Sequence, residues 1–302
     1  MGAGSVGGYF GARLIQSGHE VVFLVREGRK RALESDGLVI RSYLGDADLK
    51  VRAETDVARV GNCDVFILTI RNFHLNDDVL SNLRHFSQGN TRFISLLNGV
   101  EHIERLREIV PSSRIVGGSA FIDSRLGEKG EIVHRSQDPT IRLGIIEGSS
   151  GEKPSDIISD FQEAGVKVDY ADDLLAALWR KFTFVLLGTF TGVANSGIGA
   201  IVENKWLNSS LDTLANEIRS VAVSESVNLT PQSVQEMLAE IRAMRKEWKS
   251  LLTEDVETGR QNELESLWGY IVRKADKNGI EVPLSRLSYG MFKLKSRASG
   301  GA

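Results

Sequence analysis

The sequence predicts an α/β domain over residues 1–170, followed by an all-helical domain over residues 171–302. Three observations predict this order. A glycine-rich turn opens the chain and leads directly into a helix-like run. Buried-strand patterns then alternate with amphipathic helical patterns to about residue 170. From residue 172 onward the periodicity is helical, with no clear strand.

The opening turn has the spacing Gly-x-Gly-x-x-Gly. A helix-like run at residues 9–17 follows it, then a break at Gly18 and a buried-strand pattern at residues 20–25. This order is the fingerprint of a Rossmann-like domain, whose turn and helix start bind the pyrophosphate of a dinucleotide. The predicted cofactor-binding residues are Gly2, Gly4, Ser5, Val6 and Gly7. A glycine turn with a purely structural role is the alternative.

One element of the fingerprint is missing. A strand of about five apolar residues normally precedes the glycines, and here only Met1 does. Such a strand would be central in the sheet. Three explanations stay open: a start codon assigned too far downstream, a fragment, or a fold that has lost a main element.

The end of the strand at residues 20–25 predicts which nucleotide is bound. An acid about 20 residues beyond the glycines is expected for NAD, and Arg26 stands there instead. Glu20 lies at the wrong end of the strand. Arg26, with Arg29 or Lys30 behind it, is suited to hold a 2′-phosphate, which favours NADPH as the cofactor. A solvated basic helix start is the alternative.

Two further buried strands, at residues 62–70 and 91–97, end beside Arg71 and Asn98. Ligands of open α/β sheets lie off the carboxyl ends of the strands, so both residues are predicted to lie near the nicotinamide and its ribose. Asn98 also begins an Asn-Gly pair, for which a turn role is the alternative.

Shorter patterns predict the remaining elements. They are a helix at residues 101–108, a strand near 114–118, hairpin-like strands at 130–134 and 140–145 that finish the sheet, a loop at 149–151, a helix at 153–164 and a frayed tail at 296–302.

Composition restricts the class of protein. A net charge of −3 and a pI near 6.0 argue against a nucleic-acid partner. The single cysteine, Cys63, fits a reducing compartment and is expected in a buried strand, and no export leader is visible, so we expect a cytoplasmic protein. The uncharged residues 182–202 are expected to form a core helix followed by a loop rather than a membrane span. The histidines have no metal-ligand spacing, so no metal site is predicted.

Lys181 is the last charge before that uncharged run. Apolar surroundings lower the pKa of an ammonium, and such a lysine can donate a proton. Reduction of a ketone requires a donor of this kind, because hydride delivery to carbon leaves a developing alkoxide. A lysine whose stem packs on apolar surface while its charge stays in water is the alternative.

Several motifs in order resemble the ketopantoate reductase (2-dehydropantoate 2-reductase) family over nearly the whole chain. They are GAGSVGGYFGARL at the start, Gly18-His19-Glu20-Val21 with Arg26, LLNGV at 96–100, LWRKF at 178–182, the spacing of Asp255, Glu263 and Gly269, and GIEVP near the end.

The resemblance implies reduction of 2-dehydropantoate to pantoate with NADPH, a step toward pantothenate. It implies that Arg26 holds the 2′-phosphate and that Asn98 lies at the nicotinamide end of the cofactor, near the substrate. Lys181 takes the proton-donor position. Glu263 matches an acid that helps to organise the closed site, and it is expected to bind both the cofactor and the substrate.

The substrate half departs from the family pattern. Arg71 stands where the family has lysine, Val185 where it has a substrate-binding asparagine, and Thr189-Phe190 where Asn-Pro is common. Ser250 is the residue left to supply a substrate-binding hydroxyl. Ketopantoate is therefore the first expectation, with a more apolar 2-oxo acid, or a non-catalytic NADP-binding protein or remnant, as alternatives. The uncharged run fits either a core or a homodimer interface.

Overall fold

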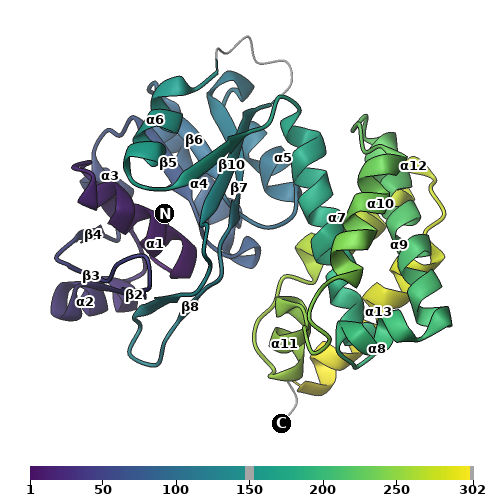
Figure 1. Cartoon of the computed structure of the whole chain (residues 1–302). Helices are drawn as coiled ribbons and strands as arrows, with labels where there is room; N and C mark the ends of the chain where they lie inside the picture. The colour runs from purple at the N-terminus through teal and green to yellow at the C-terminus, as the bar shows by residue number, and fades with distance from the viewer. Residues whose placement is uncertain (147–152, 300–302) are drawn as a thin grey trace. The chain divides into compact units, whose positions relative to one another are not determined.

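The computed structural model describes residues 1–146 and 153–299. The chain forms two compact units: residues 1–98 with 102–174, and residues 99–101 with 175–302 (Figure 1). The loop predicted at residues 149–151 and the last part of the predicted tail, residues 300–302, lie outside the described residues.

The main sheet of the first unit has the strand order β11-β10-β7-β6-β5. Its strands are β5 (Val65–Leu68), β6 (Arg92–Ser95), β7 (Ile115–Phe121), β10 (Thr140–Ile145) and β11 (Lys167–Tyr170). β5, β6 and β7 are parallel, β10 is antiparallel to β7, and β11 is parallel to β10. This confirms the predicted α/β domain and places the carboxyl ends of β5 and β6 at one edge of the sheet.

Two smaller sheets complete the strands of this unit. β1 (Val22–Leu24) pairs in parallel with β4 (Arg52–Glu54). The other sheet has the order β3-β2-β9-β8, with β2 (Leu38–Ser42), β3 (Ala47–Leu49), β8 (Ser124–Leu126) and β9 (Ile132–His134).

The prediction that residues 130–134 finish the main sheet is wrong. β9 pairs in parallel with β2, and its Ile132 is fully buried. The Ile132 side chain reaches the space beside Gly8 of the first helix. This burial joins β9 to the small sheet, so β10 pairs with β7 rather than forming a hairpin with β9.

Helices surround these sheets. They are α1 (Ser5–Gln16), α2 (Glu27–Asp36), α3 (Val57–Val60), α4 (Asp77–Ser87), α5 (Glu101–Arg107) and α6 (Ser155–Glu163). α1 buries an apolar face that includes Tyr9, Phe10 and Leu14, and the ring of Phe10 meets that of Phe161 in α6 edge-on at 6.4 Å. α4 buries Phe86 against Phe66 of β5.

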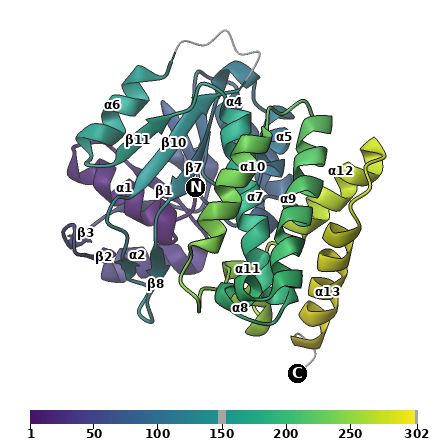
Figure 2. The ribbon, with the colours of Figure 1, turned by 45° about the vertical axis from the view of Figure 1, so that its right-hand side comes forward.

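The second unit is helical throughout its described residues. Its helices are α7 (Leu174–Val193, with Leu174 in the first unit), α8 (Ile198–Glu203), α9 (Lys205–Ser224), α10 (Pro231–Arg242), α11 (Leu251–Glu257), α12 (Tyr270–Asn278) and α13 (Pro283–Ser299), with a π-helical turn at Glu265–Gly269. α13 packs against α9 and α11, and α12 packs against α9 (Figure 2). This confirms the predicted all-helical region.

Two details differ from the sequence predictions. The tail predicted from residue 296 is helical as far as Ser299, because Phe292 is buried and Lys295 donates a hydrogen bond to the Gly192 carbonyl at 2.5 Å. Cys63 is half-buried in the loop before β5 and not in a strand.

The uncharged run begins inside α7 and continues into α8, so the predicted loop after the core helix is only a short turn. α7 is long and apolar enough to cross a membrane by length and composition. However, 61% of its most apolar window is buried inside the structure, as in the core helix of a soluble protein.

Candidate functional site

The glycine-rich turn lies against the end of β5. Gly2 has a φ of +94°, a conformation that favours glycine. The Thr69 hydroxyl donates to the carbonyl oxygens of Met1 at 2.9 Å and Gly2 at 3.1 Å. A Cβ at Gly7 would lie 2.1 Å from the Thr69 hydroxyl oxygen and 2.4 Å from the Gly2 carbonyl oxygen. Only glycine therefore allows α1 to pack this closely on the turn.

Gly4 is in a different environment. It is the N-cap of α1, with extended backbone angles and no side chain to cap the helix. A Cβ at Gly4 would meet no protein atom within 4 Å, and the first turn of α1 carries no acidic residue. The first N–H groups of the helix thus face open space, with the partial positive charge of the helix start beside them. This arrangement suits an approaching pyrophosphate. Ser5 and Val6 are the first two residues of this helix start.

Of Arg26, Arg29 and Lys30, only Arg26 is exposed. It is the N-cap of α2. Arg29 donates to the Ala3 carbonyl at 3.0 Å and to the Gly130 carbonyl at 3.2 Å, so its side chain is used to hold the glycine-rich turn. Lys30 donates to the Glu54 carboxylate at 3.4 Å. These contacts favour Arg26, and neither of its two neighbours, as the group for a 2′-phosphate.

The carboxyl ends of β1 and β5 carry a shared positive potential. Burial lowers the pKa of His74, and the positive charges of Arg26 and Arg71 lower it further. The Arg71 guanidinium lies over the ring of Phe73, 5.5 Å from its centre. Both arginines therefore act on the same place, at the edge of the unit where an anionic cofactor is expected.

Asn98 lies beside the end of β5. The Asn72 side-chain amide donates to the Asn98 carbonyl oxygen at 2.7 Å, which joins the segments that follow β5 and β6. The first unit thus brings together the glycine turn, Arg26, Arg71 and Asn98. Sequence reasoning missed Thr69 and Asn72, although each is a polar residue just beyond a buried strand and could have been found by that position.

The second unit carries Lys181 and Glu263. Lys181 is half-buried on α7. Glu263 is buried, and its backbone carbonyl accepts a hydrogen bond from the Ser266 hydroxyl at 3.1 Å. A Cβ at Gly99 would lie 3.4 Å from the Ser266 carbonyl oxygen and 3.8 Å from the Phe182 ring. The turn that follows Glu263 and the helix that contains Lys181 thus converge on Gly99.

The remaining substrate residues have structural contacts. The Ser250 hydroxyl is buried, caps α11 by accepting from the Thr253 N–H at 3.2 Å, and lies 2.9 Å from the Thr253 hydroxyl. The Thr189 hydroxyl accepts from the indole N–H of Trp268 at 2.7 Å. Val185 is half-buried on α7. The substrate role of Ser250 stays a prediction.

Over residues 1–146 and 153–299, no three or more histidine, cysteine, aspartate or glutamate side chains are grouped so that they could hold a metal ion.

An α/β unit with a glycine turn at a strand end, an open helix start and an exposed arginine after β1 defines a dinucleotide-binding protein. Two family models match the chain: "Ketopantoate reductase PanE/ApbA" over residues 1–148 and "Ketopantoate reductase PanE/ApbA C terminal" over residues 173–296. The chain belongs to the ketopantoate reductase family, and it is an NADPH-dependent oxidoreductase of that family.

Relatives match along the whole chain. An uncharacterized oxidoreductase, YkpB of Bacillus subtilis, is 28% identical over 97% of both chains. A 2-dehydropantoate 2-reductase of Nostoc is 27% identical over 97% of this chain and 93% of its own. The crystal structure of a 2-dehydropantoate 2-reductase from Geobacter metallireducens superimposes with a TM-score of 0.86 at 26% identity, covering 97% of this chain and 98% of the other.

Proposed function

We propose that the protein reduces 2-dehydropantoate to pantoate with NADPH, and that Lys181 donates the proton. The observation that carries the proposal is the match of both halves of the chain to the ketopantoate reductase models. The geometry of the first unit supports the cofactor half, because Gly4 leaves the start of α1 open and Arg26 is exposed beside β1.

The cofactor supplies the hydride when it is bound. In this proposal Gly2, Gly4 and Gly7 shape the pyrophosphate turn, and the helix start at Ser5 and Val6 donates N–H groups to it. Arg26 pairs with the 2′-phosphate, and the side chains of Arg71 and Asn98 contact the nicotinamide end. Such pairing makes NADPH the preferred nucleotide over NADH.

Lys181 acts on the substrate oxygen. As hydride reaches the carbonyl carbon, negative charge develops on that oxygen, and an ammonium there stabilises the charge and then transfers a proton. Glu263 is proposed to hold Lys181 in position. Asn98 is proposed to bind the substrate, and Ser250 is its proposed hydroxyl partner. General acid catalysis of this kind is worth about 10²–10⁴ in rate.

A second substrate is favoured by one observation. Val185 lies on α7, four residues after Lys181 and thus on the same helix face, where a polar group would contact the terminal hydroxyl of ketopantoate. An unpaired substrate hydroxyl costs about 1–3 kcal/mol. A more apolar 2-oxo acid avoids that cost.

The loss of NADPH absorbance with each 2-oxo acid decides between these substrates. A higher kcat/KM for ketopantoate than for 3,3-dimethyl-2-oxobutanoate, in which hydrogen replaces the terminal hydroxyl, supports the proposal. The reverse order supports the apolar alternative. NADPH binding without turnover of any 2-oxo acid would contradict both and leave a binding function.

Location and assembly are also proposals. We propose a cytoplasmic location. The apolar helix α7 is compatible with it, because much of α7 is buried within the structure. A homodimer is proposed because the uncharged run that begins in α7 could also pack against a second copy of the chain, and sedimentation of the purified chain tests it.

A further inference from the structure

His74 is a titratable side chain at the cofactor edge of the first unit that the proposed function does not use. It ends the 3₁₀ turn η1 (Asn72–His74), which follows shortly after β5. The His74 N–H donates to the Arg71 carbonyl at 2.9 Å, so the turn folds back on the end of the strand. The imidazole is half-buried and meets the Phe73 ring edge-on, with 4.3 Å between the ring centres. These contacts hold His74 at the carboxyl end of β5.

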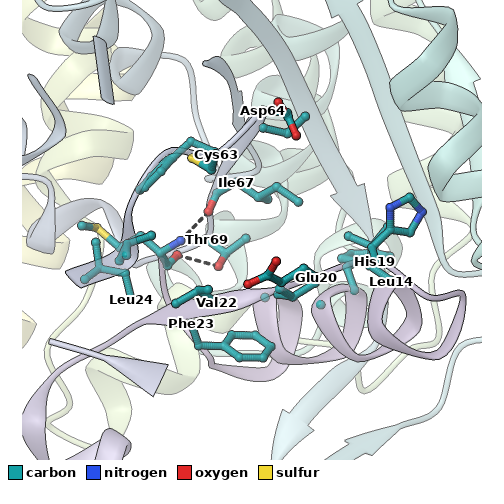
Figure 3. A pocket seen from close by; sticks show the side chains of 18 of the residues that line it. Leu14, His19, Glu20, Val22, Phe23, Leu24, Cys63, Asp64, Ile67 and Thr69 are labelled. Carbon is teal, nitrogen blue, oxygen red and sulfur yellow. Dashed lines mark hydrogen bonds between the residues drawn. The ribbon is translucent and has the colours of Figure 1, made fainter. Parts of the chain in front are cut away.

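The glycine-rich turn lies between the ends of β1 and β5. On one side the Gly2 N–H donates to the Leu24 carbonyl of β1 at 3.0 Å. On the other side the hydroxyl of Thr69, just beyond β5, donates to the Met1 carbonyl at 2.9 Å, a bond drawn as a dashed line in Figure 3. Both strand ends adjoin the same short segment, so they lie about two strand spacings, or roughly 9–10 Å, apart.

Arg26 and His74 therefore flank this turn from opposite sides. Arg26 follows β1 and is the exposed N-cap of α2, whereas His74 follows β5. The charges that act on the imidazole are those of Arg26 and Arg71, and they add to burial in lowering the pKa of His74. Two acids close by in the sequence are paired with other cations, as Glu27–Arg31 and Asp77–Arg105. With these cations acting on it, the imidazole stays neutral at pH 7.

The phosphate that Arg26 is proposed to hold changes this balance. A phosphate monoester carries a charge of about −1.5 to −2 at pH 7. Beside Arg26 it offsets the positive charges that act on His74, and a nearby negative charge favours the charged form of an imidazole. We propose that His74 is a second residue that reads the 2′-phosphate, and that it takes up a proton when NADPH binds and so adds to the preference for NADPH over NADH.

Proton uptake and nucleotide binding are linked in both directions. A phosphate that favours protonated His74 is itself bound more tightly when His74 is protonated. The affinity for a 2′-phosphorylated nucleotide should therefore increase by about threefold to tenfold as the pH falls through the titration range of His74. A nucleotide without that phosphate should gain much less, so His74 makes the choice of nucleotide depend on pH.

Isothermal titration calorimetry without substrate counts the protons. NADP⁺ and NAD⁺, which are stable in mild acid, are titrated at about pH 6, within the range of histidine. Two buffers of different ionisation enthalpy give the protons taken up. His74→Gln keeps a polar side chain that does not titrate. His85→Gln is the matched control, because His85 is an exposed histidine on α4 of the same unit.

The 2′-phosphate has its own pKa near 6, so each variant is compared with the parent chain at the same pH. His74→Gln should take up fewer protons with NADP⁺ than the parent chain and His85→Gln do. It should also bind NADP⁺ about threefold to tenfold more weakly than they do at about pH 6, with little change for NAD⁺. Equal proton counts in the parent chain and His74→Gln would overturn the proposal.

NMR of the His74 ring in the parent chain is a second measurement, which needs no variant for its readout. NADP⁺ should raise the pKa of His74 more than NAD⁺ does, whereas a ring that only packs on Phe73 would respond to both nucleotides alike. A pKa of His74 that NADP⁺ leaves unchanged would overturn the proposal.

The role of His74 depends on the proposed role of Arg26, and the outcomes separate the two. A preference for NADP⁺ that Arg26→Ala removes and His74→Gln leaves intact at every pH would overturn the role of His74 and support that of Arg26. A parent chain that binds NADP⁺ and NAD⁺ with equal affinity would overturn both.

Discussion

Two glycines of the opening turn provide a matched pair of substitutions, Gly4→Ala and Gly7→Ala. Both add one methyl group within three residues of each other. At Gly7 the methyl carbon would lie 2.1 Å from the Thr69 hydroxyl oxygen and 2.4 Å from the Gly2 carbonyl oxygen. At Gly4 no protein atom lies within 4 Å. The two variants therefore separate packing of the fold from access of the cofactor.

The expected magnitudes follow from these contacts. Overpacking costs about 1–3 kcal/mol, and contact with backbone favours the upper end. Alanine gains about 1 kcal/mol over glycine inside a helix, which leaves Gly7→Ala less stable by about 2 kcal/mol. In a domain of this size, the melting temperature should decrease by about 4–8 °C. For Gly4→Ala, a small loss at the N-cap and a gain from the stiffer unfolded chain offset each other to within about 1 kcal/mol.

Thermal unfolding without cofactor and a fluorescence titration with NADPH measure the two effects. Gly4→Ala should melt like the parent chain and bind NADPH at least about tenfold more weakly, equivalent to about 1.4 kcal/mol. A Gly7→Ala variant as stable as the parent chain would refute the packing role of Gly7, and unchanged NADPH affinity in Gly4→Ala would refute the role of Gly4 in cofactor access.

Three further predictions use other contacts. Arg26→Ala should weaken NADPH binding by about tenfold or more but leave NADH binding nearly unchanged, because a charge-assisted hydrogen bond is worth about 1.5–3 kcal/mol. Arg31→Ala is the control, because Arg31 is exposed and pairs with Glu27. Equal losses of affinity for both nucleotides in a titration would contradict the assignment of Arg26. Thr189→Val should cost about 1–3 kcal/mol in urea unfolding, because it strands the buried indole N–H of Trp268. Thr183→Val should lower the free energy of unfolding by less, since the buried Thr183 hydroxyl donates to the carbonyl of Trp179 one turn earlier in the same helix. The opposite order would refute the role of Thr189. The folded pKa of the Met1 amine is about 5 against an ordinary value of 8.0, so the unfolded chain binds the extra proton and the free energy of unfolding should rise from pH 5 to pH 8. The rise is up to about 4 kcal/mol, and an N-terminally acetylated chain should lack that part of it; identical pH profiles would show that the amine is not buried.

The sequence predicts the cofactor half of the molecule well because its signals are local. Three glycines at fixed spacing, a helix and a strand within 25 residues need few long-range contacts to be interpreted. Local sequence does not determine the sheet to which β9 belongs. It depends on the pairing of Ile132 with Ile40, more than 90 residues away.

Side-chain roles that depend on distant backbone were also beyond the sequence. Arg29 and Lys30 have the same composition signal as Arg26, and only the Ala3 carbonyl and the Glu54 carboxylate distinguish them. Thr189 replaces an asparagine of the family pattern, and its partner Trp268 lies 79 residues further along the chain. A motif shows which residue is present, whereas its hydrogen-bond partner is set by packing.

We propose that Lys181 supplies the proton in reduction of a 2-oxo acid by NADPH. The most direct measurement is the rate of NADPH oxidation at saturating ketopantoate for the parent chain, Lys181→Met and Arg180→Gln, with NADPH binding measured alongside. Arg180 is the control because it is the adjacent cation and pairs with Glu236 and Glu240. Lys181→Met should lose about 10²–10⁴ in kcat, while its NADPH affinity and the rate of Arg180→Gln should stay near the parent values. A Lys181→Met enzyme with the parent rate would contradict this proposal.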